Sequence, residues 1–289
     1  MDETGQHGTN RIRAPVGLTS YEKSFGLQFV HETDTLGQAE SRTRILVSDH
    51  RYGMPRDLAG KKIAIVGNGL VKGCGPLIDS CDEVIRISTM RNWQQSADHD
   101  GLKTTIWAGH PWLVVHRGSA GDLRANPKFA ELMNRQPRLW VISPFHTSVD
   151  SFRWLCEKQI IDRTIFNPSW TEVYEVACSK LDFAEIKRIF SISNRKDIIG
   201  FNNYELLLTG TRIILLLYLC GVSNINIFGT NLFNFSKKDV WFGHDIYQDF
   251  FTINYIKKRI LDEGGKFYWN EEPYVRRAKF LNKFRIWKQ

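Results

Sequence analysis

The stretch that most constrains the fold is residues 61–89, which read KKIAIVGNGLVKGCGPLIDSCDEVIRIST. An apolar run at residues 63–66 ends in a glycine turn at 67–69, and a second apolar run follows at residues 83–87. Short apolar runs bounded by glycines are typical of strands that are buried in a parallel sheet. The stretch therefore predicts an α/β protein whose sheet is mostly parallel.

The turn formed by Gly67, Asn68 and Gly69 directly follows the first predicted strand. Glycines at this place let the backbone approach a phosphate at the carboxyl edge of the sheet. Two common phosphate motifs do not fit, because Lys72 stands where G-x-G-x-x-G needs its last glycine and is not preceded by the glycine of a P-loop. The turn predicts a nucleotide-type ligand, and a plain strand and turn without a ligand is the alternative.

Further apolar runs alternate with helical patterns along the chain. We expect strands at 104–107, 139–143, 226–229 and 266–269, helices at 127–136, 212–220 and 246–263, a helical and aromatic region at 148–190, and a loop at 90–103. Strands that alternate with helices are typical of doubly wound α/β folds. The prediction is a single Rossmann-like α/β/α domain.

Composition sets outer limits on the class of protein. With 42% hydrophobic and 24% charged residues, the chain is an ordinary globular sequence. Its longest apolar run, residues 213–220, is too short to span a bilayer, and the N-terminus lacks the apolar core of a signal peptide. The five cysteines show no C-x-x-C spacing, so we expect reduced thiols in a cytoplasmic protein. The net charge of +8 favours an anionic partner.

Two histidines follow predicted strands at the edge where ligands collect in open α/β sheets. His110 follows the third strand, and His146 follows the fourth and is the weaker candidate. Each histidine is also compatible with an ordinary turn. His110 is therefore a candidate site residue, and a histidine in an ordinary turn is the alternative.

Thr209, Gly210 and Thr211 precede a strongly apolar helix at residues 212–220. The start of such a helix offers backbone N–H groups and two hydroxyls, which suit a phosphate or a carboxylate. A simple N-cap explains one of the two threonines equally well.

Three segments resemble, in order, the sialyl motifs of the sialyltransferases of glycosyltransferase family 29, with distant similarity to bacterial family 42. Residues 66–105, which begin with VGNG at 66–69 and end with DGLKTT at 100–105, resemble the large motif. The segment from Thr209 to Gly229 resembles the small motif. His244, which is followed five residues later by Asp249, resembles the very small motif.

This resemblance implies a GT-A-like fold and an inverting transferase without an essential metal or other cofactor. The donor would be a CMP-activated sialic acid or related 2-keto-3-deoxy sugar acid, and the acceptor a glycan or glycolipid. His244 would be the general base. By the same resemblance, the donor-binding residues would be Gly67, Asn68, Gly69, Ser88, Thr209, Gly210, Thr211, Gly229 and Asn231.

The chain also departs from the family pattern. The aromatic or histidine motif that helps to bind the donor phosphate is not recognisable, and Phe233 and Phe235 lie near the place where family 42 has tyrosines. His110, Lys237 and Lys238 are the candidates to contact the phosphate or the acceptor instead. CMP-Kdo is therefore a competing donor.

The predicted organisation is a tail and lead-in at 1–60, a transferase domain at 61–273 and a basic, aromatic tail at 274–289. The last segment has the pattern of a helix that lies on an anionic membrane, or of a solvated tail. We expect a cytoplasmic enzyme, peripheral on the inner membrane, in bacterial capsule or lipopolysaccharide synthesis. A non-catalytic nucleotide- or RNA-binding protein is the alternative class. It lacks a recognisable RNA-binding motif, so no nucleic acid partner is expected.

Overall fold

The structure is a computed structural model that describes residues 54–90, 93, 96–110, 113, 115–117, 123–125, 138–141, 164–166, 170–193, 203–230, 232 and 244–270. These residues form a seven-stranded sheet in the order β7-β6-β3-β2-β1-β8-β9, in which every neighbouring pair is parallel. The strands are β1 Lys62–Val66, β2 Glu83–Ile87, β3 Ile106–Gly109, β6 Arg138–Val141, β7 Thr164–Phe166, β8 Asn224–Phe228 and β9 Lys266–Trp269. The prediction of an α/β fold with a mostly parallel sheet is confirmed.

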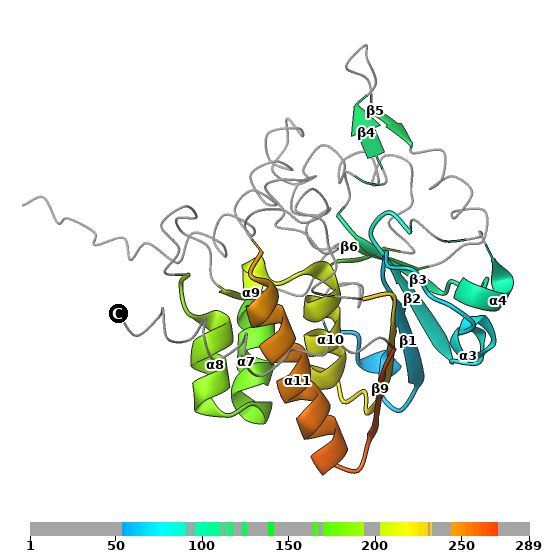
Figure 1. Ribbon diagram of the computed structural model, residues 1–289. Coiled ribbons are helices and arrows are strands. Elements are labelled where there is room, and N and C mark those ends of the chain that lie inside the picture. Colours follow the sequence, from blue (N-terminus) through cyan, green and yellow to red (C-terminus); the bar gives the residue numbers. More distant parts are fainter. Residues whose placement is uncertain are drawn as a thin grey trace, which may run out of the picture.

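Helices cover both faces of this sheet (Figure 1). The helices are η1 Arg56–Leu58, α3 Gly75–Asp79, α4 Ala97–Asp100, α7 Trp170–Lys180, α8 Phe183–Phe190, α9 Asn203–Leu206, α10 Thr209–Leu219 and α11 Ile246–Asp262. Helices α3 and α4 lie on one side of the sheet, and α7 to α11 lie on the other. A small antiparallel pair, β4 Val115–Arg117 and β5 Leu123–Ala125, stands apart from the main sheet.

The two-residue alternation of β1 divides the core between the two faces. Ile63 and Ile65 belong to the large core on the side of α7 to α11, whereas Ala64 and Val66 pack in a smaller cluster with Ile78 of α3. Helix α10 is buried from Gly210 to Leu219. A helix that is apolar on every side must be covered on every side, and α10 occupies the centre of its layer.

Most of the predicted elements are present, with some differences. Strands β2 and β9 have the predicted bounds, while β3 begins at Ile106, two residues later than expected. The predicted loop at 90–103 contains α4, and the predicted helical region at 148–190 contains the short strand β7 before α7. Both are short elements whose conformation is set by neighbours in space and not by a local repeat.

The direction of the strand order reverses between β1 and β8. From β1 the chain proceeds through β2 and β3 in one direction, and it later returns to place β8 on the other side of β1. Ligands of open α/β sheets bind outside the carboxyl ends of the strands at such a reversal. The turn at residues 67–69, which follows β1, lies at this position.

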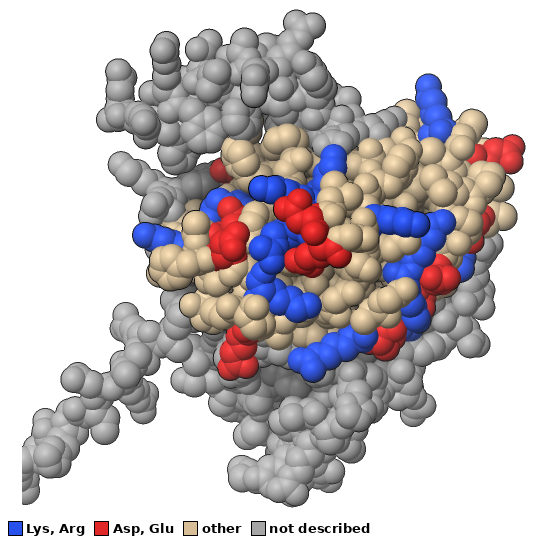
Figure 2. All heavy atoms as spheres, turned by 90° about the horizontal axis from the view of Figure 1, so that it is seen from below, with Lys and Arg blue, Asp and Glu red and all other residues tan. Residues whose placement is uncertain are grey.

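The opposite end of the molecule carries charges of both signs (Figure 2). Figure 2 views the protein from below, where α11 ends in Figure 1, and shows blue and red side chains mixed over this face. Several are paired, as in Lys61–Glu83 at 2.6 Å and Arg259–Glu263 at 3.2 Å. The described part of this face therefore does not present one continuous basic surface to a polyanion.

Within the ranges that the structure describes, no helix has both the length and the apolar character that crossing a bilayer requires. The predicted helix at 127–136, the tail at 274–289 and almost all of the predicted tail at 1–60 lie outside the described residues. Met54 and Leu58, at the end of the predicted lead-in, are buried in the large core.

Candidate functional site

The turn after β1 is tied to the end of β8. The backbone N–H of Gly67 donates to the carbonyl of Phe228 at 2.9 Å, and that of Gly69 donates to the carbonyl of Gly229 at 2.8 Å. A Cβ at Gly67 would lie 2.5 Å from the carbonyl oxygen of Gly229. These glycines are thus needed for the close approach of two loops. Both N–H groups already donate to carbonyls at the end of β8, so the Gly67 and Gly69 amides are not available as donors to a phosphate.

Asn68 and Ser88 lie beside this junction at the carboxyl ends of β1 and β2. Asn68 Oδ1 accepts a hydrogen bond from Thr89 Oγ1 at 3.2 Å, which joins the two loops. Ser88 has a φ of 59°, in the left-handed region that a non-glycine residue rarely adopts. Strain of this kind persists only where the surroundings impose it, and it is concentrated at functional sites.

The first turn of α10 reaches the same edge of the sheet. A Cβ on Gly210 would lie 3.2 Å from Ile87 Cδ1, which places the start of α10 against the end of β2. Residue Leu208 is the N-cap and has no capping side chain of its own; its N–H donates to Asp249 Oδ1 at 2.8 Å instead. The start of α10 is therefore fixed by a carboxyl group from α11.

His244 immediately precedes α11 and is held by a backbone carbonyl. Its Nδ1 lies 2.6 Å from the carbonyl oxygen of Leu206. A carbonyl oxygen only accepts, so Nδ1 carries the proton and Nε2 is the acceptor nitrogen of the neutral ring. A neutral ring of this tautomer can accept a proton at Nε2. Among the described contacts of His244, it is the carbonyl of Leu206 that orients the ring.

Asp245 has a different role, because it is the N-cap of α11. Its Oδ1 accepts from the backbone N–H groups of Tyr247 at 3.0 Å and Gln248 at 3.4 Å. Asp, Ser and Asn are favoured at this position because the side chain satisfies N–H groups that the helix leaves open. The cap fixes where α11 begins and therefore where the His244 backbone lies.

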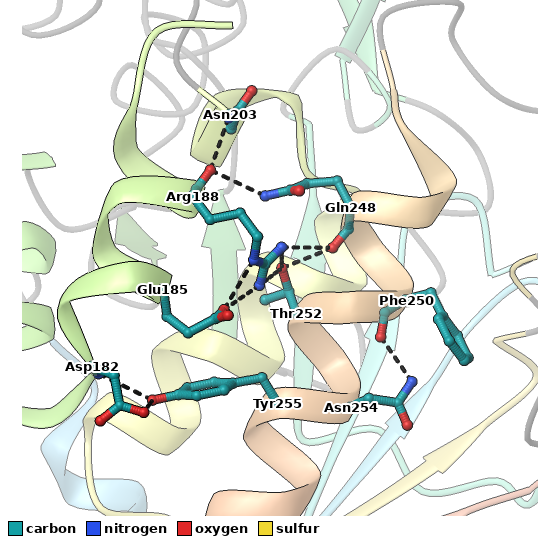
Figure 3. Close-up of polar contacts among 9 residues, drawn as sticks. All are labelled: Asp182, Glu185, Arg188, Asn203, Gln248, Phe250, Thr252, Asn254 and Tyr255. Atoms are coloured by element: carbon teal, nitrogen blue, oxygen red, sulfur yellow. Dashed lines mark hydrogen bonds and ion pairs between the residues drawn. The ribbon is translucent and has the colours of Figure 1, made fainter. Parts of the chain in front are cut away.

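A polar network between α8, α9 and α11 holds the first turns of α11 in place (Figure 3). Arg188 of α8 donates to the hydroxyl of Thr252 at 3.3 Å and is also paired with Glu185. The carbonyl of Arg188 accepts from Gln248 at 3.3 Å and from Asn203 at 2.8 Å. Because Asn203 belongs to α9, which ends at Leu206, the network links both elements that position His244.

His110 follows β3 at the same edge and is electrostatically linked to this group. Burial, and then the charges of Arg212 and His244, lower the pKa of His110 to about 3. His110 is therefore neutral at pH 7. The charges of Arg212 and His244 affect His110 because α10 and the start of α11 are near the end of β3.

Asp249 is fully buried behind the start of α10. Burial raises the pKa of this carboxyl to about 7, against the opposing effects of the Thr211 hydroxyl and the Leu208 N–H. Asp249 Oδ2 and Thr211 Oγ1 complete no hydrogen bond with good geometry among the described residues. A carboxyl in such a place holds its proton more tightly than the same group in the unfolded chain.

This pKa predicts a pH dependence of stability that an Asp249→Asn variant should lack. The folded pKa is raised, so the unfolded state loses its proton first and the wild-type free energy of unfolding declines from about pH 4 to about pH 7. From pH 5 to pH 8 the variant should gain about 2–3 kcal/mol relative to the wild type.

Urea denaturation at both pH values measures this difference. Asp262→Asn, which removes an exposed carboxylate from the last turn of the same helix, is the matched control. Equal pH dependence of the wild type and Asp249→Asn would contradict a raised pKa at Asp249.

The structure brings most of the predicted site residues to one edge of the sheet. They are Gly67, Asn68, Gly69, Ser88, His110, Thr209, Gly210, Thr211, Gly229 and His244. Asn231, Lys237, Lys238 and His146 lie outside the described residues. The sequence analysis missed Arg212 and the carbonyl of Leu206. An arginine inside an otherwise apolar helix was a signal that could have drawn attention to Arg212.

Neither a metal cluster nor a disulfide is formed by the described residues. They contain no group of three or more His, Cys, Asp or Glu side chains that could hold a metal ion. Cys74, Cys81, Cys178 and Cys220 are not in disulfides, and Cys156 is outside the described ranges.

Comparisons with known proteins find similar solved structures. A mammalian sialyltransferase, solved with Gal-beta-1-3GalNAc-ortho-nitrophenol, is 14% identical, with a TM-score of 0.46 over 86% of this chain and 85% of that chain. The Campylobacter jejuni sialyltransferase CstII, solved with CMP-3FNeuAc, is 13% identical, with a TM-score of 0.43 over 72% of this chain and 80% of that chain. No protein-family model and no curated protein matches the chain.

Proposed function

We propose that the protein is a glycosyltransferase of the sialyltransferase type. It would transfer a sialic acid or related 2-keto-3-deoxy sugar acid from a CMP-activated donor to a glycan acceptor, with inversion and without an essential metal. The observation that carries this proposal is the arrangement of His244, whose ring is fixed by Leu206 close to the start of α10, which lies against the carboxyl end of β2. Three sequence segments in the order of the sialyl motifs support the choice of donor.

The chemistry follows from one displacement at the anomeric carbon. His244 Nε2 accepts the proton of an acceptor hydroxyl as the hydroxyl oxygen bonds to the anomeric carbon, and the bond from that carbon to the phosphate oxygen of CMP breaks. Attack opposite to the leaving group inverts the configuration. The leaving phosphate develops negative charge, which fixed dipoles and cations can stabilise in place of a metal ion.

The lowered pKa of His110 distinguishes its role from that of His244. Because the pKa of His110 is lowered to about 3, this residue is a poor proton acceptor at pH 7 and suits hydrogen bonding to a neutral group instead. His244 donates from Nδ1 to a neutral carbonyl, which leaves its acceptor nitrogen as the base. We therefore propose His244 as the base and His110 as a binding residue.

Thermal stabilisation by a panel of nucleotides tests the donor class. CMP, CDP, UMP, UDP, GDP and NAD would each be added with and without EDTA, and CMP should raise Tm most, with no effect of EDTA. A ligand that binds only the folded state adds about 2.7 kcal/mol of stability at a hundredfold excess over its Kd. Stabilisation by UDP or GDP that depends on a metal would contradict the proposal.

Turnover assays with CMP-sialic acid and CMP-Kdo would then separate the two donor sugars. CMP binding without transfer from either donor to a panel of glycan acceptors would favour a non-catalytic nucleotide-binding protein.

A further inference from the structure

Two residues of the turn after β2 have backbone conformations that residues other than glycine rarely adopt. Ser88 has a φ of 59° and Met90 has a φ of 48°, and no other non-glycine residue in the described part of the chain has a positive φ. Conformations of this kind cost free energy, so they persist only where the surrounding structure imposes them. The turn at residues 88–90 is therefore held in its shape by its neighbours.

Trp107 of β3 supplies one of the contacts that hold this turn. It is 2% exposed, and its indole Nε1–H donates to the carbonyl of Ser88 at 2.9 Å. Gly109 leaves the room that the indole needs, since a Cβ there would lie 2.9 Å from Trp107 Cζ2 and 3.3 Å from Ser88 Cα. The backbone N–H of Ser88 donates to the carbonyl of Ala108 at 2.8 Å. Strand β3 thus holds Ser88 at both its N–H and its carbonyl.

The turn at 88–90 lies within the candidate site. The hydroxyl of Thr89 donates to Oδ1 of Asn68, in the glycine turn after β1, at 3.2 Å. Ile87, the last residue of β2, lies against Gly210 at the start of α10. The strained turn therefore joins two of the loops at the carboxyl edge of the sheet. Strain at such a place fixes the shape of a site before its ligand arrives, which lowers the ordering cost of binding.

We propose that Trp107 is a positioning residue of the candidate site, which holds the turn at 88–90, and through it Asn68, in the shape that binds the CMP-activated donor. The identity of this ligand rests on the proposed function, whereas the hold of Trp107 on the turn does not. Without the indole N–H, the turn relaxes toward unstrained conformations, and the ligand binds only the fraction that keeps the competent shape. The apparent Kd rises in inverse proportion to that fraction.

Trp107→Phe tests the proposal, because it keeps an aromatic ring on β3 and removes the indole N–H. The variant should bind CMP about 3- to 10-fold more weakly in a calorimetric titration, the effect of one lost hydrogen bond. Its kcat at saturating donor should stay close to the wild-type value, because the bound donor selects the competent turn. A defect in folding alone would lower the amount of active protein and therefore kcat, and would leave the Kd of the folded fraction unchanged.

Trp140→Phe is the matched control. Trp140, on the neighbouring strand β6, is 0% exposed, and its Nε1 has no hydrogen-bond partner among the described residues. The same substitution there removes the same atoms from the core without breaking a hydrogen bond, so CMP should bind as it does to the wild type. Gly109→Ala breaks the contact of Trp107 in a second way, because the added methyl group displaces the indole. It should weaken CMP binding as Trp107→Phe does, and it serves if that variant does not fold.

Hydrogen–deuterium exchange of the ligand-free protein measures the hold on the turn directly. The N–H groups of Ser88 and Met90 donate to the carbonyls of Ala108 and Ile87, at 2.8 and 3.3 Å. Both amides should exchange faster in Trp107→Phe than in the wild type and in Trp140→Phe, and CMP should slow them again.

The outcomes separate this inference from the proposed function. Unchanged exchange at residues 88–90 in Trp107→Phe and Gly109→Ala would overturn the positioning role, even if the wild type transfers the sugar. An equal loss of CMP affinity in Trp140→Phe would overturn it as well. Faster exchange in both variants, with no binding of CMP to the wild type, would support the hold of Trp107 on the turn and contradict the proposed donor.

Discussion

Replacing His244 by alanine is expected to lower kcat for sugar transfer by about 10²–10⁴-fold, the usual contribution of a positioned general base. The structure supports this value because Leu206 fixes both the orientation and the tautomer of the ring. The effect should fall on kcat and leave CMP affinity nearly unchanged, since the proton is taken from the acceptor. Initial rates with a CMP-activated donor, and CMP binding in parallel, measure the two quantities.

His99→Ala is the matched control for this experiment. His99 is an exposed histidine on α4, on the other side of the sheet, where its Nδ1 accepts from the N–H of Gly73 at 3.1 Å. Its loss should leave transfer intact. A His244→Ala protein that turns over at nearly the wild-type rate would remove His244 from the mechanism and leave His110 as the remaining described histidine of the site.

Arg86→Met is expected to lower the free energy of unfolding by about 3–5 kcal/mol, the range for breaking a buried ion pair. The substitution leaves Asp100 Oδ2 as a buried charge without its guanidinium, and it also removes the donors to the carbonyls of Asp100 and Gly101. Urea denaturation at pH 7 measures the loss.

The informative comparison is with the same substitution at Arg212. Both arginines are 2% exposed, so burial alone predicts equal effects. The hydrogen bonds predict a large loss at Arg86 and none at Arg212. Similar losses at both positions would show that Arg212 has a structural role.

The central strands could be predicted because their sequences are sufficient to define them. Residues 63–66 and 83–87 are apolar runs bounded by turn residues, and β1 and β2 occur there. The strand at 164–166 has three residues and is stabilised by pairing with β6, which no local pattern shows. Elements of this kind are defined by their partner and not by their own sequence.

The sequence predicted where the candidate site residues lie better than it predicted what each of them does. Strand ends and glycines correctly indicated the edge that holds Gly67, His110 and the start of α10. The hydrogen bond from Gly67 to Phe228 could not be expected, because it depends on β8 becoming the neighbour of β1. Arg212 could not be recognised for a related reason: only the packed structure shows that α10 is covered on all sides and that Arg212 Nε has no hydrogen-bond partner among the described residues.

The position of β8 has a consequence for how the chain is made. Strands β1, β2, β3, β6 and β7 leave the ribosome first, and one edge of β1 stays open until residues 224–228 are synthesised. An exposed edge of a buried, apolar strand is a template for pairing with other chains. We therefore expect the nascent chain to be prone to aggregation until β8 has been synthesised. Fragments that end before β8 are expected to aggregate, whereas those that include β9 complete the sheet.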